Sequence, residues 1–209
     1  MCIRDRNYRT NLSGHDLNRM WRNPKREYHR EVCSIKKFLV EVNRENPISI
    51  ILDLHGHSRA VNSFFYGNPS KKENSNGYEN PRFFPYFCSK KIKQISYLQS
   101  TFKATECKKN TARVVLSEIF PKALVYTFET SFHGWKRSQC VVEHSQESYR
   151  KVGRDLVNCY LDYVRIAEKN AESVEKWQRE IEDIALSINK DTNCCDESDS
   201  EAENELISF

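Results

Sequence analysis

Two histidines follow a short apolar segment, and this pattern places groups that could do chemistry at the end of a strand. Residues 50–54 read Ile-Ile-Leu-Asp-Leu and lead directly into His55, Gly56 and His57. A short apolar run entered after Pro47 predicts a buried strand. Ligands of open α/β sheets bind beyond the carboxyl ends of the strands, so a histidine here is placed to bind a metal or transfer a proton. The alternative is a polar residue satisfied by hydrogen bonds, and this segment alone does not separate the two.

A second strand and an N-terminal loop carry side chains that would complement such a histidine. The strand predicted over 123–130 has Glu129 near its end, and the loop before the first helix offers Arg9, Asn18 and Arg19. A neutral imidazole binds zinc, a nearby carboxylate acts as general base on the metal's water, and a guanidinium pairs with a substrate carboxylate. The set therefore suits metal-assisted hydrolysis. Each piece alone also fits a solvated loop charge or a surface ion pair.

The elements that must position these residues alternate between helical and strand patterns. Apolar residues recur every three or four positions in the helical segments, whereas the strands are short and apolar. The predicted elements are helices over 24–46, about 90–103 and 147–163, and strands over 50–55 and 123–130. Residues 111–120 fit either a short strand or a helical turn, and residues 67–82 read as a surface loop. The helix followed by a strand within 24–55 predicts one half of a parallel α/β unit.

Composition and charge narrow the class of protein. Of the 209 residues, 38% are hydrophobic and 30% are charged, so part of the chain is expected as solvated helix or tail. The basic side chains could favour an acidic partner, but they form no arginine-rich run, so nucleic acid is not expected. No apolar run reaches about 18 residues, so no membrane span is expected. The eight cysteines form no Cys-x-x-Cys pair and fit reduced thiols in a cytosolic protein.

The C-terminal part differs from the rest in charge. Residues 166–193 keep helical spacing but carry only a thin apolar stripe, which predicts an exposed, charged helical extension. Residues 194–209 follow as an acidic tail, in which positions 196–205 hold six carboxylates and no base. Such a composition predicts disorder.

Five segments, taken in order, resemble the catalytic domain of the cytosolic carboxypeptidases. They are NYRTNLSGHDLNRMW at 7–21, ILDLHGHSR at 51–59, FFYGN at 64–68, TARVVL at 111–116 and VYTFETSF at 125–132. That family belongs to the zinc metallocarboxypeptidase superfamily and includes tubulin deglutamylases. The resemblance covers roughly residues 7 to 163. It implies an α/β fold, part of a doubly wound mixed β-sheet with flanking helices, in a partial catalytic domain over 7–165.

The resemblance also implies a role for each residue of the motifs. His55 corresponds to the third zinc ligand of the family. Asn18 and Arg19 correspond to the pair that grips the C-terminal carboxylate of the substrate. Arg9 resembles the arginine that polarises the scissile carbonyl and stabilises the oxyanion. Glu129 resembles the general base that activates the attacking water and then delivers a proton to the leaving amine.

Two further positions are expected to line the substrate pocket. Arg113 resembles the family's pocket-lining position, where a cation would suit a glutamate side chain. His57 is interpreted as lining the pocket without binding metal, because the intervening Gly56 predicts a turn after His55. Asp53 could accept the second ring N–H of His55, although a hydrogen bond to neighbouring backbone is the favoured interpretation.

The sequence departs from the family in its zinc ligands. The family's first two ligands come from a His-x-x-Glu motif upstream of the carboxylate-gripping loop, whereas only residues 1–6 precede the resemblance here. His144 and Glu147 have the same spacing but begin a helix after the general base, where a first-turn carboxylate is expected. His15 is expected at the surface. Since zinc sites need three or four protein ligands, the Zn²⁺ site is predicted to be incomplete and the chain inactive alone. An open sheet edge would also predict poor solubility.

These observations leave hypotheses from different classes. The first is a fragment of a zinc carboxypeptidase that removes C-terminal residues, glutamate above all, from acidic protein tails such as those of tubulin. Its expected location is the cytoplasm, in association with microtubules. The second is a non-catalytic module that binds acidic C-terminal tails through Arg9, Arg19 and Arg113 without a metal. The third, a structural helical protein with a basic surface, fits the C-terminal residues but not the motifs.

Overall fold

A three-stranded mixed sheet lies at the centre of the molecule. The computed structural model describes residues 9–69, 80–169 and 171–191. Its sheet consists of β1 (Ile50–His57), β3 (Leu124–Ser131) and β2 (Ser63–Tyr66), in the order β1-β3-β2. Strands β1 and β3 are parallel, and β2 is antiparallel to β3. The parallel pairing places the carboxyl ends of β1 and β3 side by side, with His55 opposite Glu129.

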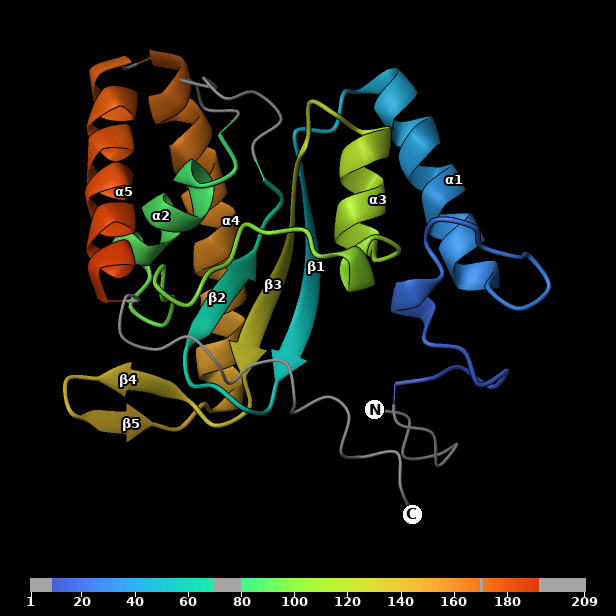
Figure 1. Ribbon diagram of the computed structural model, residues 1–209, viewed down its shortest axis with the longest axis horizontal. Helices are drawn as coiled ribbons and strands as arrows, with labels where there is room; N and C mark the ends of the chain where they lie inside the picture. Colours follow the sequence, from blue (N-terminus) through green and yellow to red (C-terminus); the bar gives the residue numbers. More distant parts are fainter. Residues whose placement is uncertain (1–8, 70–79, 170, 192–209) are drawn as a thin grey trace.

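Helices cover both faces of this sheet. Helices α1 (Arg30–Glu45) and α3 (Ala112–Ile119) lie on one side, and α2 (Phe83–Lys91), α4 (Gln146–Lys169) and α5 (Ala171–Asp191) lie on the other (Figure 1). Side chains of β3 alternate between the two layers, as expected for a strand. Tyr126 and Phe128 are buried against α2 and α4, whereas Val125 packs in the cluster with α1 and α3. The predicted α/β fold with flanking helices is confirmed.

Shorter elements complete the described chain. They are the 3-10 turns η2 (Leu17–Arg19) and η3 (Glu106–Lys108), and the hairpin of β4 (Trp135–Arg137) and β5 (Cys140–Val142). Within the described residues no helix is both long and apolar enough to cross a membrane.

The helix predicted over about 90–103 is wrong. Helix α2 ends at Lys91, and the segment that follows forms turns and single bridges along β2. Isolated bridges join Ser63 to Ile95 and Tyr66 to Thr101, and the Ser63 amide donates to the carbonyl of Gln94 at 2.7 Å. Of the apolar side chains that suggested helical spacing, Ile92, Ile95 and Phe102 are buried, whereas Leu98 is exposed.

Other boundaries follow local signals more closely. Helix α1 begins at Arg30, later than the predicted start at residue 24, because residues 25–29 form turns. The ambiguous segment 111–120 forms α3, and the strand predicted over 123–130 is β3. Strand β1 runs on through His57, so the turn predicted at Gly56 is wrong. A Cβ at Gly56 would lie 2.3 Å from ring atoms of the exposed Phe132 side chain, which would have to move to accommodate it.

The C-terminal helix α5 packs on the domain, which corrects its predicted exposure. Val174 and Ile181 are buried in the same apolar cluster as α2 and α4. The Trp177 ring stacks on Tyr163 with centroids 5.8 Å apart and contacts Phe87 at 5.1 Å. Val174, Trp177 and Ile181 thus attach α5 to the domain through a narrow apolar face. The predicted acidic tail at 194–209 lies outside the described residues.

Candidate active site

An open cleft of about 1440 Å³ lies beyond the carboxyl ends of β1 and β3. The arrowheads of these strands lie in the same half of the molecule as the segment that carries residues 9–29, which is at their right in Figure 1. This is the sheet edge where the parallel pairing predicts a ligand site. The cleft brings together all seven predicted site residues, which come from four separate stretches of chain: Arg9, Asn18, Arg19, His55, His57, Arg113 and Glu129.

His55 is oriented by a side chain on its own strand. Its Nε2 lies 2.8 Å from Oδ2 of Asp53, and both side chains are about one-third exposed. The two residues are two positions apart and therefore share one face of β1. This contact raises the pKa of His55, through the hydrogen bond and the negative charge of Asp53, while burial acts against it. When Nε2–H donates to Asp53, Nδ1 keeps the lone pair that a metal ion needs.

Asp53 thus orients His55 through its side chain, and the backbone interaction favoured from the sequence is not the one observed. The parallel register sets Glu129 directly across from His55. Burial raises the pKa of Glu129, and Asp53 raises it further, whereas His55, Arg9 and Lys108 lower it. A carboxyl group held between these opposing influences suits a general base.

Arg9 and the 3-10 turn η2 are held together by Asp16, a residue that was not among the predicted site residues. One carboxylate oxygen of Asp16 lies 3.0 Å from Nη2 of Arg9, and the other accepts the Asn18 amide N–H at 2.9 Å. Arg9 itself adopts a φ of 55°, in the left-handed region. An aspartate immediately before a short helical turn is a capping signal that could have identified this role.

Asn18 links the N-terminal loop to helix α3. Its Oδ1 accepts the backbone N–H of Ala112 at 3.0 Å, so it caps a helix that begins 94 residues later. Because the amide oxygen is engaged, the amide NH₂ is the part of this side chain free to bind a substrate. Arg19 donates to the Asn18 carbonyl at 3.3 Å and also lines the cleft.

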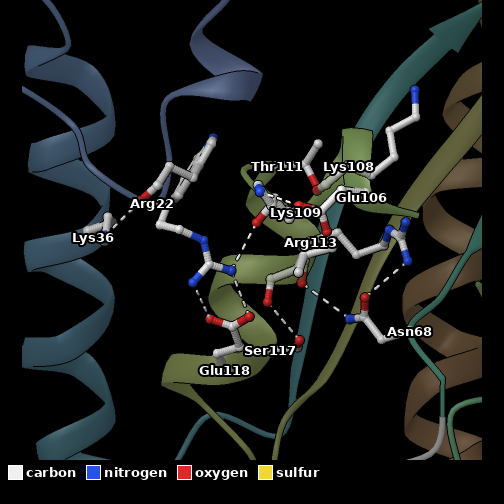
Figure 2. A network of polar contacts seen from close by, with 12 residues as sticks. Arg22, Lys36, Asn68, Glu106, Lys108, Lys109, Thr111, Arg113, Ser117 and Glu118 are labelled. Atoms are coloured by element: carbon white, nitrogen blue, oxygen red, sulfur yellow. Dashed lines mark hydrogen bonds and ion pairs between the residues drawn. The ribbon is translucent and has the colours of Figure 1, made fainter. Parts of the chain in front are cut away.

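Two contacts outside the cleft anchor this loop. Arg22 pairs with Glu118 of α3 at 2.7 Å, and Nζ of Lys36 donates to the Trp21 carbonyl at 2.8 Å (Figure 2). The loop is therefore fixed to both α1 and α3. These contacts with α1 and α3 help to fix the positions of Asn18 and Arg19.

Arg113 forms part of the cleft wall with its guanidinium engaged by oxygens. Its Nη1 donates to the Gly67 carbonyl and to Oδ1 of Asn68 at 3.0 Å, and Nη2 donates to the Lys103 carbonyl at 3.5 Å. Figure 2 shows the contact with Asn68. The side chain is buried, and this burial lowers the pKa of Arg113. Asn68, which sequence reasoning did not single out, thus orients the arginine.

His57 lines the cleft with one ring nitrogen already engaged. Its Nδ1 accepts the backbone N–H groups of Arg59 and Ala60, each at 3.0 Å. The ring also meets Phe64 edge-on at 5.1 Å. Burial, with a smaller contribution from Arg59, lowers the pKa of His57. The neutral ring therefore holds the turn after β1, and its Nε2 carries the proton.

Two other histidines lie away from the cleft chemistry. His15, expected at the surface, is half-buried, and its Nδ1 lies 3.0 Å from Nε2 of His29. His144 stacks on Tyr149 at 4.5 Å, and its Nδ1 lies 2.9 Å from Oγ of Ser148. The His-x-x-Glu spelling at 144–147 therefore reflects local packing at the start of α4.

The residues described here do not make a complete zinc site. Among residues 9–69, 80–169 and 171–191, no three histidine, cysteine, aspartate or glutamate side chains lie close enough together to hold a metal ion. Zinc requires three or four protein ligands. His55, with Nδ1 available, fits one position of such a site and no more.

The chain has sequence relatives among the carboxypeptidases. No family model matches the chain. The chain is 30% identical over 165 residues to cytosolic carboxypeptidase 6 of Homo sapiens, and the alignment covers 77% of this chain and 32% of that protein. Cytosolic carboxypeptidase 6 of Caenorhabditis elegans is 29% identical over 168 residues, covering 75% and 36%. The chain belongs to the cytosolic carboxypeptidase family.

Solved structures carry the same fold. A metallo-carboxypeptidase from Burkholderia cenocepacia has a TM-score of 0.60 at 23% identity, covering 76% of this chain and 41% of that chain. A metallo-carboxypeptidase from Pseudomonas aeruginosa, solved in complex with (2-guanidinoethylmercapto)succinic acid, has a TM-score of 0.60 at 20% identity, covering 76% and 42%. The chain spans about a third of the length of the curated relatives named above.

Proposed function

We propose that this chain supplies the substrate-binding part of a zinc metallocarboxypeptidase. One observation carries the proposal. A half-buried carboxylate, Glu129, lies opposite His55 in a cleft that also contains Asn18 and Arg19. That combination provides a proton acceptor, one metal ligand and a receptor for a terminal carboxylate. Membership of the family supports the same reaction class.

Each residue then has a stated task. Arg19 and the NH₂ of Asn18 bind the C-terminal carboxylate of a peptide. Arg9 donates to the scissile carbonyl oxygen and stabilises the charge that develops there. Glu129 accepts a proton from the attacking water and delivers it to the leaving amine. His55 would hold zinc through Nδ1, and further ligands would have to come from outside the described residues. Zinc, when bound, supplies Lewis acidity.

The substrates we propose are acidic protein tails ending in glutamate, such as those of tubulin, with the enzyme in the cytoplasm and associated with microtubules. Six arginine and lysine side chains line the cleft against four carboxylates, which favours an acidic peptide. The cytosolic relatives support the location.

The decisive experiment compares Glu129→Gln with wild type in the full-length gene product. Release of glutamate from a peptide ending in glutamate should fall by roughly 10²–10⁴-fold, the usual contribution of a general base, while peptide binding persists. Glu41→Gln is a matched control, since Glu41 is an exposed carboxylate that pairs with Lys37 on α1 and does not line the cleft. Near-normal turnover by Glu129→Gln would show that the base is assigned wrongly.

A second function is favoured by the cations of the cleft. A module that binds acidic C-terminal tails needs only the cations of the cleft, and Arg9, Arg19 and Arg113 are all present there. This alternative predicts that a pentaglutamate peptide binds with the same affinity before and after treatment with a chelator. It also predicts no bound zinc by elemental analysis of the full-length gene product. Zinc in stoichiometric amount, with hydrolysis, would exclude it.

A further inference from the structure

Two histidine rings join the N-terminal loop of the cleft to the turn before helix α1. This loop carries Asn18 and Arg19, which together are called the carboxylate receptor below. Nε2 of His29 lies 3.0 Å from Nδ1 of His15, and the ring centroids are 4.9 Å apart. His29 is buried, with 3% of its surface exposed, and His15 is half-buried. Neither ring is among the described residues that line the cleft, so any effect of the pair on a ligand passes through other residues.

The hydrogen-bond pattern assigns the ring protons of this pair. The backbone N–H of Lys25 donates to Nδ1 of His29 at 2.9 Å, so this nitrogen is an acceptor and the ring proton lies on Nε2. Nε2–H of His29 then donates to Nδ1 of His15, which must also be an acceptor. Each ring therefore has a single tautomer that fits its partners.

A second contact fixes the same loop beside the first. Nδ2 of Asn11 donates to the Tyr28 carbonyl at 2.7 Å, and Oδ1 of Asn11 accepts the backbone N–H of His15 at 3.0 Å. The Asn11 amide also donates to the His15 carbonyl at 3.0 Å, and the Tyr28 ring meets the His15 ring edge-on at 5.7 Å. Both ends of the turn 11–15 are thus tied to residues 28–29 by side-chain hydrogen bonds.

His15 immediately precedes Asp16, which holds the rest of this loop together. Asp16 pairs with Arg9 at 3.0 Å and accepts the Asn18 amide N–H at 2.9 Å. Arg9 has a φ of 55°, a conformation that a non-glycine residue keeps only when its surroundings hold it there. The apparent affinity of a site falls in proportion to the population of its binding-competent conformation. An anchor adjacent to Asp16 therefore acts on the affinity of the cleft.

We propose that the hydrogen bond between His15 and His29 positions the carboxylate receptor for the terminal carboxylate of the substrate. The two histidines act as positioning residues through Asp16, and they do not touch the substrate. This inference rests on the proposed function, because it takes the carboxylate receptor as the group that binds the end of the peptide. His15 was expected at the surface, and the sequence did not connect either histidine with the site.

The test compares a peptide that ends in a free carboxylate with the C-terminal amide of the same peptide. Acetyl-Gly-Tyr-Gly-Glu and its amide differ only at the group that the carboxylate receptor would bind. Calorimetry on the full-length gene product, in a Glu129→Gln background that prevents hydrolysis, gives the ratio of their dissociation constants. His15→Leu keeps an apolar side chain and removes the acceptor. We expect it to lower the preference for the acid by roughly three- to tenfold, as for the loss of one neutral hydrogen bond.

Three further variants separate positioning from a general loss of structure. His15→Asn places an acceptor oxygen where Nδ1 lies, so it should restore the preference to within about twofold of wild type. His144→Leu is the matched control, because it makes the same exchange at a half-buried histidine beside the start of α4, outside the cleft, and should leave the preference unchanged. Asn18→Asp already impairs the carboxylate receptor, so adding His15→Leu to it should cause no further loss of preference.

Different results overturn this inference and the proposed function. The role of the histidine pair is wrong if wild type prefers the acid and His15→Leu keeps that preference, or if His15→Asn loses as much as His15→Leu. An equal loss of affinity for acid and amide, or a loss of preference in His144→Leu, also overturns it. No acid preference in the wild-type protein refutes the carboxylate receptor and the role of His15 together. Failure of the carboxypeptidase proposal is read separately, from the absence of glutamate release by the protein with Glu129 intact.

Discussion

Asn18 allows a test in which stability and substrate binding are expected to move in opposite directions. Its Oδ1 caps helix α3 at the amide of Ala112, while its NH₂ is free to face a ligand. Asn18→Asp keeps the capping oxygen and replaces the NH₂ by a second oxygen. A carboxylate at a helix N-terminus stabilises by about 0.3–1 kcal/mol, so the free energy of unfolding should stay level or rise slightly.

Binding should respond in the other direction. The new oxygen cannot donate to the substrate's terminal carboxylate, and its charge repels that group. Loss of one hydrogen bond to a charged group costs about 1.5–3 kcal/mol, which corresponds to roughly ten- to a hundredfold in the dissociation constant. Repulsion adds to this loss. The variant should therefore unfold like wild type in urea and bind a peptide acid far more weakly.

A peptide amide provides the internal control for the same experiment. Wild-type protein should prefer the free acid over the C-terminal amide of the same peptide, and Asn18→Asp should lose most of that preference. Asn18→Ala should lose both properties, since removing a capping oxygen costs about 1 kcal/mol of stability. If Asn18→Asp binds the acid as wild type does, Asn18 is only a cap and the assignment of the carboxylate receptor is refuted.

Two further predictions concern the helices that surround the site. Trp177→Ala should lower the free energy of unfolding by about 3 kcal/mol, because the ring packs on Phe87 and Tyr163; Lys176→Ala, on the exposed side of the same helix, should change it by less than about 0.5 kcal/mol. An equal loss in both variants, measured by urea denaturation, would mean that α5 does not pack through this tryptophan. Burial lowers the pKa of His144 below its ordinary value of 6.5, and its buried Nε2 has no hydrogen-bond partner among the described residues. The unfolded state therefore takes up a proton first as the pH falls, so stability should decline below about pH 6.5 and level off once the folded state is also protonated. His144→Gln should flatten this part of the stability curve, and an unchanged slope would assign the pH dependence to other groups.

The pattern of apolar residues in the sequence predicted the two parallel strands of the sheet. The strand ending in His55 and the strand carrying Glu129 were predicted because short apolar runs bounded by turn signals are typical of strands. The burial predicted for the first of them is wrong, since β1 is half-buried and Leu54 is exposed. The helix predicted at 90–103 failed for the opposite reason. Ile92, Ile95 and Phe102 are buried, but by pairing along the edge of β2, and that partner is not visible in a local window.

The packing of helix α5 is a second feature that the local sequence did not predict. Its charged composition predicted exposure, yet Tyr86 of α2 donates a hydrogen bond to Glu180, and Trp177 packs between α2 and α4. A narrow apolar stripe is enough when the facing surface is rich in aromatic side chains. The aromatic residues that face α5 belong to α2 and α4, so the sequence of α5 alone cannot reveal them.

The sequence by itself determined the residue types of the site and the two strand ends that carry His55 and Glu129. Each of these features depends on a short run of consecutive residues. Only the tertiary structure decided how those residues are engaged. Asn18 is oriented by the start of α3, and Arg113 by the main chain after β2. The physical reason is that hydrogen bonds satisfy whichever donor and acceptor the folded chain brings together, and these partners lie far apart in sequence.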